Sequence, residues 1–174
     1  MNIFDIFKKK NKQEKVTVED NHFQEVLDDF NKHDYLSKAA EAGHKANAAI
    51  KNKEFDKAWG FYHEQKLLYM QHADRSGFTM QQVFALDSQV HENLANILRI
   101  ESKHDDALVN ILYWIIANND KPIKRHQQKL TAYFNRCKFG NTSIEDAMVF
   151  STINMASLDY SSIQLKVSEW RSRG

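Results

Sequence analysis

The chain has 174 residues, and its 24 lysines and arginines are nearly balanced by 23 aspartates and glutamates, so its overall charge indicates neither a nucleic acid nor a membrane as partner. A hydrophobic share of 42% and a charged share of 27% exclude a chain that is disordered throughout. The single cysteine, Cys137, excludes a disulfide framework, and five glycines with one proline are too few for the turns of an all-β protein. We therefore expect an all-α protein in the reducing cytoplasm.

The N-terminal region, 1–19, is predicted to be a tail and linker. Ile3, Phe4 and Phe7 lie in a short apolar patch that precedes three lysines, the reverse of the charge order of a secretory signal. One or two turns of helix are marginally stable alone, which favours a tail that frays or folds back. The alternative is a weak contact of this patch with an anionic membrane.

Residues 20–174 are predicted to form one helical domain of about eight helices. Apolar residues at helical spacing place these helices near 20–30, 35–51, 54–74, 79–101, 105–118, 122–137, 142–155 and 160–170. Capping boxes are predicted where Thr79 precedes Gln82 and where Thr142 precedes Glu145, since a hydroxyl and a carboxylate or amide three residues apart can satisfy the free amides of a helix start. The helix near 35–51 carries a stripe of small residues, which predicts close packing against its neighbour.

Two polar segments 49 residues apart, 53–58 and 102–107, resemble each other, and each opens the second helix of a predicted hairpin. The alignment also equates Ala46 with Ala95, Asn47 with Asn96, and Tyr62 with Ile111. This pattern resembles the tetratricopeptide repeat (TPR), a helical hairpin with small residues inside its first helix and an aromatic residue before its second. Phe55 holds the aromatic position of the first unit, whereas His104 holds that of the second. The spacing of 49 rather than about 34 residues implies helices longer than the family's.

The resemblance implies that 36–119 forms TPR-like hairpins, which 120–170 extends as further helices in a short α-solenoid or bundle. It also implies a groove lined by the first helix of each hairpin. The residues expected in this groove are Asn47, Lys51, Asn93, Asn96 and Arg99. Asparagine amides can bond to an extended backbone, and basic side chains can pair with carboxylates. The leading hypothesis is therefore a non-catalytic adaptor, scaffold or inhibitor that holds an acidic or C-terminal peptide of another protein.

A second group of cations provides the alternative hypothesis. The stretch 121–144 contains no aspartate or glutamate, and its basic residues are Lys121, Lys124, Arg125, Lys129 and Arg136, followed by Lys138. A helix with such a face can contact the phosphates of a nucleic acid, although a solvated surface explains the same pattern.

The sequence contains few patterns that indicate catalysis. Arg99 and His104 have a spacing similar to that of HEPN-type helical ribonucleases, which implies phosphodiester cleavage as a further alternative. The eight histidines do not form the paired helical spacing of a zinc protease, and a Gly-rich phosphate loop is absent from the sequence. We therefore expect no catalytic residues, no metal and no cofactor.

Overall fold

The computed structural model describes residues 24–25, 28–29, 33–152 and 159–174. The chain divides into two compact units, Met1–Asp34 and Tyr35–Gly174. In the first unit, the described residues before position 30 are helical. The N-terminal tail with its apolar patch, for which membrane contact was the alternative, and most of the helix predicted near 20–30, lie outside the described residues.

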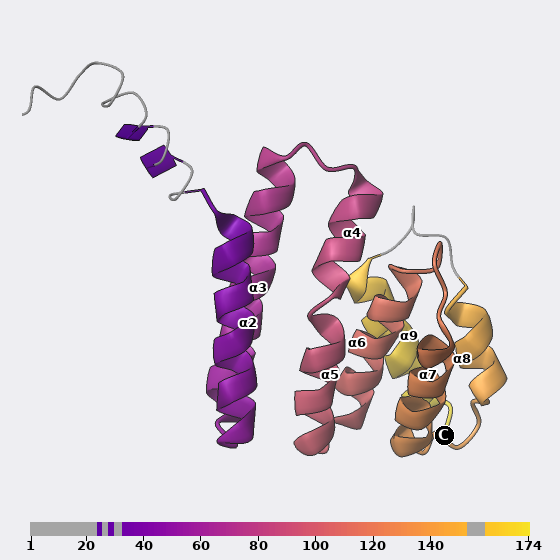
Figure 1. Ribbon diagram of the computed structural model, residues 1–174. Helices are drawn as coiled ribbons and strands as arrows, with labels where there is room; N and C mark the ends of the chain where they lie inside the picture. Colours follow the sequence, from indigo (N-terminus) through magenta and orange to yellow (C-terminus); the bar gives the residue numbers. More distant parts are fainter. Residues whose placement is uncertain (1–23, 26–27, 30–32, 153–158) are drawn as a thin grey trace, which may run out of the picture. The chain divides into compact units, whose positions relative to one another are not determined.

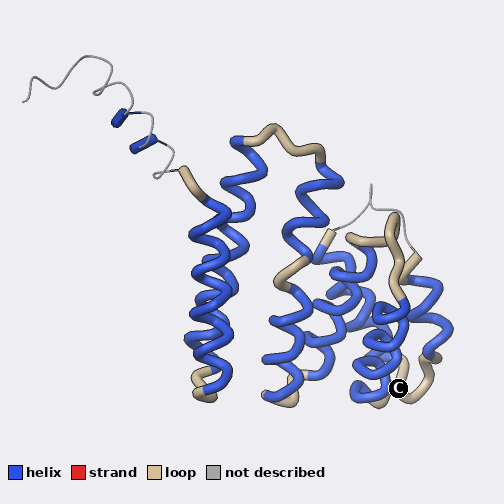
Figure 2. The backbone as a smooth tube through the Cα atoms, in the orientation of Figure 1, coloured by secondary structure: helices blue, strands red, loops and turns tan. Residues whose placement is uncertain are grey.

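The second unit consists of helices joined by loops (Figures 1 and 2). They are α2 (Tyr35–Lys51), α3 (Phe55–Arg75), α4 (Met80–Ser88), α5 (His91–Ile100), α6 (His104–Ile116), α7 (Lys124–Cys137), α8 (Ile144–Phe150) and α9 (Tyr160–Ser172). The described residues contain no strand, so the predicted all-α class is confirmed. The TPR-like stacking of these helices stays a prediction.

Helices α2 and α3 form an antiparallel hairpin, side by side in Figure 1. Of the alanines predicted in the small stripe of α2, Ala39, Ala46 and Ala49 are buried, whereas Ala40 is exposed and Ala42 is buried in its place. Gly43 shows how closely the helices approach, because a Cβ atom at this position would lie 2.9 Å from Nε2 of Gln65 on α3. Small side chains thus allow α2 to lie directly against its neighbour.

The turns that follow α2 and α5 have the same backbone conformation. Lys53 and Ser102, the equivalent residues of the sequence echo, are left-handed, with φ of 61° and 62°. In each turn the amide of the next residue donates to a carbonyl five residues earlier. The amide of Glu54 donates to the carbonyl of Ala49 at 2.9 Å, and the amide of Lys103 donates to the carbonyl of Leu98 at 2.8 Å. Both turns are therefore Schellman motifs, which satisfy the last carbonyls of a helix before the chain reverses.

The continuous helix predicted near 79–101 is wrong, because α4 ends at Ser88 and α5 begins at His91. The hydroxyl of Ser88 donates to the carbonyl of Ala85 at 2.9 Å and accepts from the side-chain amide of Asn118, in the turn that follows α6, at 2.9 Å. A hydroxyl bonded to a carbonyl of the preceding turn favours a bend in a helix. The tertiary contact with Asn118 holds this bend in place.

The two predicted capping boxes have different outcomes. The box of Thr79 with Gln82 is confirmed at the start of α4. The box predicted at Thr142 is wrong by one residue, because Ser143 caps α8 together with Asp146. The serine hydroxyl and the Asp146 carboxylate satisfy the same two amides that the box requires.

Helix α6 is the centre of the larger hydrophobic core. All its residues from Ala107 to Ile116 are buried, as expected for a helical segment in which every residue except Asn110 is apolar or aromatic. It packs against α5, α7 and α9, and Trp170 of α9 belongs to the same cluster. Because α5 and α7 both rest on α6, their outer faces are held in fixed positions.

Candidate functional site

A groove of about 310 Å³ lies between α5 and α7. Its lining consists of Asn96 and Arg99 from α5 and of Arg125, Gln128, Lys129, Ala132, Tyr133 and Arg136 from α7. Four of these side chains are cationic, and the lining contains no carboxylate. The groove is therefore a site of concentrated positive charge on a nearly neutral protein.

Helical periodicity explains why each helix presents these residues together. On α5, Asn96 and Arg99 are three residues apart and share the face that points away from the buried Leu94 and Ile97. On α7, Arg125, Lys129 and Arg136 recur at spacings of four and seven, one or two helical turns. The opposite face of α7 is buried against the core at Leu130, Phe134 and Cys137.

Tyr133 forms the floor of the groove and is 3% exposed. Its hydroxyl donates to Oδ1 of Asn96 at 2.7 Å, which joins the two helices. Lys129 and Arg136 lie over its ring, with the cationic atoms 5.8 and 5.9 Å from the ring centre. Burial raises the pKa of the Tyr133 phenol, while the neighbouring Arg99 acts in the opposite direction because a cation favours the phenolate. The phenol thus remains protonated and can donate to Asn96.

The cations of the groove fall into two groups. Glu92, whose side chain is 12% exposed, pairs with Arg125 and with Lys129, the latter at 3.3 Å. Among the residues that the structure describes, Arg99 and Arg136 have no carboxylate partner. An incoming anion therefore meets two unneutralised guanidinium groups beside Tyr133.

The groove combines residues that sequence analysis assigned to two competing hypotheses. Asn96 and Arg99 came from the predicted peptide groove, and Arg125, Lys129 and Arg136 came from the predicted basic helix. The sequence contains no signal for their proximity, since they belong to two helices, α5 and α7, that are separated by α6 in the chain.

The other predicted site residues lie elsewhere. Asn47 on α2 is engaged locally, as its Oδ1 accepts from the Tyr62 hydroxyl at 2.9 Å, and Lys51 is exposed at the end of the same helix. Asn93 is half-buried on α5 outside the groove lining. Lys121 is exposed before α7, and Lys124 lines a separate, more apolar cavity.

Arg99 and His104, the pair of the ribonuclease hypothesis, line different cavities. His104 lies with Asp105, Cys137 and Arg171 in a second pocket of about 340 Å³, which shares only Arg136 with the groove. Its neighbour Asp105 is bound by the guanidinium of Arg171. Within the described residues, groups of three or more histidine, cysteine, aspartate or glutamate side chains suited to a metal ion are absent.

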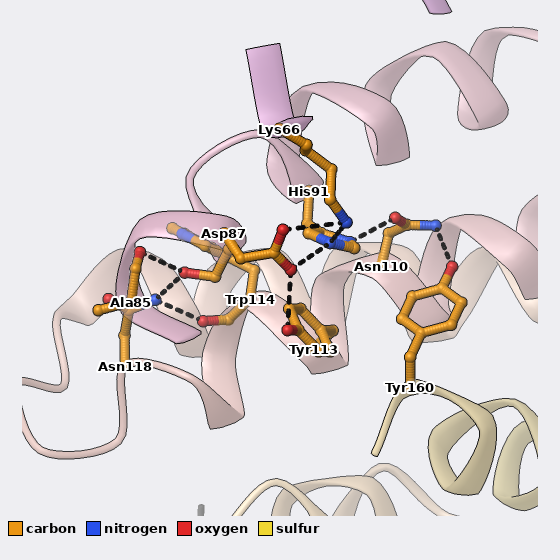
Figure 3. A network of polar contacts seen from close by, with 10 residues as sticks. Lys66, Ala85, Asp87, His91, Asn110, Tyr113, Trp114, Asn118 and Tyr160 are labelled. Atoms are coloured by element: carbon orange, nitrogen blue, oxygen red, sulfur yellow. Dashed lines mark hydrogen bonds and ion pairs between the residues drawn. The ribbon is translucent and has the colours of Figure 1, made fainter. Parts of the chain in front are cut away.

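A network of polar contacts centred on His91 and Asn110 was missed by sequence analysis (Figure 3). It joins five helices through Lys66, Asp87, His91, Asn110, Tyr113 and Tyr160. Asn110 was the available signal, because it is a lone amide in the otherwise apolar run of α6. A buried amide in such a run requires polar partners from neighbouring helices.

The geometry of the network places a proton on Nδ1 of His91. This nitrogen lies 2.8 Å from Oδ1 of Asn110, and because an amide oxygen can only accept, Nδ1 is the donor. Nε2 of His91 lies 2.8 Å from Nζ of Lys66 and 3.5 Å from Oδ2 of Asp87. The Asn110 amide nitrogen then donates to the Tyr160 hydroxyl at 3.0 Å and to the carbonyl of Asp106 at 2.9 Å. Each polar group is satisfied, and α5 is fixed against α6.

Asp87 closes the other end of the network. Its carboxylate accepts from the Tyr113 hydroxyl at 2.9 Å and pairs with Lys66 at 3.2 Å. Burial by itself would raise the pKa of Asp87, but the hydrogen bonds and charges of His91, Lys66 and Tyr113 together hold it below its usual value. The network therefore fixes α5, one of the two helices that line the groove, and none of its residues belongs to the groove lining.

Comparisons of the chain with protein-family models, with curated proteins and with solved structures found no match. In the part of the chain that the structure describes, none of the helices has the length and apolar character needed to cross a membrane. The fold and the site by themselves define the class: an all-helical protein with a preformed, positively charged groove.

Proposed function

We propose that the protein is a non-catalytic binding module, of the adaptor or inhibitor type, that holds an acidic segment of a partner protein between α5 and α7. The observation that supports this most directly is the convergence of four cationic side chains from two helices around Tyr133. Such a concentration of like charge is unfavourable in isolation and is offset when an anion occupies the groove.

The side chains of the groove suit a polypeptide ligand. The planar guanidinium groups of Arg99 and Arg136 can each bind a carboxylate through two parallel hydrogen bonds. Gln128 adds an amide that can bond to the peptide backbone. The contact between Tyr133 and Asn96 and the packing of both helices on α6 fix this surface before binding, which lowers the entropic cost of association.

The proposal that 36–119 forms TPR-like hairpins has two supports. One is the sequence echo, and the other is the shared turn geometry at Lys53 and Ser102. Ala46 and Ala95, equivalent in that alignment, are both fully buried between helices. The chain departs from two consecutive hairpins in one respect, because the additional helix α4 lies between α3 and α5.

A nucleic acid is the second candidate ligand, because the exposed Lys121 and Lys124 continue the positive charge of α7 beyond the groove. Cations on such a surface contact phosphates, and binding of this kind weakens steeply with added salt. Binding of a nucleic acid would require the exposed lysines as well as the groove arginines, whereas binding of an acidic peptide requires only the groove.

Fluorescence anisotropy with a labelled glutamate-rich decapeptide tests the proposal. Reversing Arg99→Glu and Arg136→Glu together should weaken binding at least about tenfold, since each removes a charge pair within the groove. Lys121→Glu with Lys124→Glu is the matched control, because it changes the net charge equally outside the groove, and it should cost about twofold or less.

Equal losses in the two double variants would contradict a groove-specific site. A labelled twelve-nucleotide RNA serves as the competing ligand. Tighter binding of the RNA than of the peptide, with a steep salt dependence and sensitivity to the Lys121 and Lys124 changes, would replace the proposal by the nucleic-acid alternative. Circular dichroism of each variant verifies that the helices remain folded.

A further inference from the structure

The charge of the groove exceeds what one carboxylate can balance. Arg99, Arg125, Lys129 and Arg136 contribute four positive charges, and Glu92 is the only carboxylate that pairs with any of them among the described residues. Three positive charges therefore remain. A carboxylate ligand brings one negative charge and two oxygens, whereas a phosphate monoester brings about 1.5 to 2 charges and three strong acceptor oxygens.

We infer that the groove recognises a phosphorylated side chain of the partner in preference to a carboxylate, an inference that rests on the proposed function and specifies its ligand. Arg99 from α5 and Arg136 from α7 are the guanidinium groups left without a carboxylate. They enter the groove from its two sides and bind two of the phosphate oxygens.

Lys129 is placed to bind the third oxygen. Its ammonium group lies over the Tyr133 ring and 3.3 Å from Glu92, so it is held inside the groove rather than free in solvent. A lysine is a compact charge with three donors and can serve Glu92 and a phosphate at once. Three cationic side chains thus converge from two helices, which matches the three oxygens of the ligand.

Glu92 contributes to this selectivity. Its carboxylate already holds Arg125 and Lys129, so a second carboxylate competes with a resident anion of the same charge. A doubly charged phosphate gains more from the same cations, because the electrostatic energy grows with the charge of the ligand.

Three labelled peptides of one glycine–serine host sequence, with phosphoserine, aspartate or serine at the centre, test the inference by fluorescence anisotropy. At pH 7.5 the phosphoserine peptide should bind at least about tenfold more tightly than the aspartate peptide, a difference of about 1.4 kcal/mol. Arg99→Gln with Arg136→Gln should abolish this preference, and Lys121→Gln with Lys124→Gln should preserve it.

A pH series provides an independent readout. The second phosphate proton has a pKa of about 6, so at pH 5 the phosphoserine peptide carries about one charge and its advantage should shrink to about threefold or less. The groove lining contains no histidine, so this change reports the charge of the ligand. A preference that does not change with pH would overturn the inference.

The possible failures are distinguishable. Equal affinity for the phosphoserine and aspartate peptides, both above the serine peptide, would overturn the inference and leave the acidic-peptide proposal intact. Equal affinity for all three peptides would overturn both. Tighter binding of a twelve-nucleotide RNA than of the phosphoserine peptide, through Lys121 and Lys124, would assign the phosphate contacts to a nucleic acid and overturn both as well.

Discussion

Replacing Tyr113 by phenylalanine tests the buried polar network with a minimal change. The Tyr113 side chain is 6% exposed, and the substitution removes only the hydroxyl that donates to Asp87 at 2.9 Å. Burial and the charge of Asp87 raise the pKa of this phenol, so it is a hydrogen-bond donor at every pH at which the protein is studied. The variant therefore removes one hydrogen bond to a charged acceptor.

A hydrogen bond to a charged group contributes about 1.5–3 kcal/mol. Asp87 keeps its ion pair with Lys66, and its side chain is 14% exposed and accessible to water, which places the expected loss near the lower limit, at about 1.5–2 kcal/mol. With a urea dependence of about 1–3 kcal/mol per molar, the unfolding midpoint should fall by about 1 M. The fluorescence of the buried Trp114 and Trp170 reports the transition.

Two comparisons determine whether the charge of Asp87 is responsible. Tyr69→Phe is the matched control, because the Tyr69 hydroxyl accepts from the neutral amide of Gln65 in a half-buried position, and it should cost about 0.5 kcal/mol. In an Asp87→Asn background the Tyr113→Phe change should cost about 1 kcal/mol less than in the wild type. An unchanged cost in that background, or a midpoint equal to that of Tyr69→Phe, would refute the assignment.

Three further predictions concern local features. Lys53→Gly and Ser102→Gly should each raise the free energy of unfolding by about 0.5–1 kcal/mol in thermal or urea unfolding, because glycine adopts the left-handed conformation without a Cβ penalty. A loss of stability in either variant would contradict the idea that the left-handed residue of the turn is strained. Because the pKa of Asp87 is lower in the folded protein than its usual value near 3.8, its carboxylate stabilises the fold at pH values above 3.8, and this stability is lost as the pH falls through the folded-state pKa. Between pH 5 and 3, the free energy of unfolding should therefore fall less for Asp87→Asn than for the wild type. Parallel pH profiles of the two proteins would contradict this. Burial raises the pKa of the Cys137 thiol to about 12, so a thiol reagent at pH 8 should modify the unfolded chain and leave the native protein unmodified over the same time; rapid labelling of the native protein would show that this thiol is accessible.

Most residues of the candidate site could be predicted from the sequence, but their proximity could not. Five of its lining residues, Asn96, Arg99, Arg125, Lys129 and Arg136, were identified from the sequence by residue type and helical face. That these residues line one groove was not predicted, because α5 and α7 are not consecutive helices of a hairpin and the buried α6 lies between them in the chain. The role of Glu92 was missed for the same reason, since its partners lie 33 and 37 residues further along the chain.

The sequence by itself determined the features that depend on a few neighbouring residues. The period of apolar side chains specified the helices, Thr79 and Gln82 specified a helix start, and the stripe of small residues on α2 specified a close helix pair. Only the tertiary structure decided that the segment 79–101 bends, that Asn110 connects His91 to Tyr160, and which cations share a groove. The physical reason is that caps and helical periodicity act within one or two turns, whereas these features depend on distances between helices that packing alone sets.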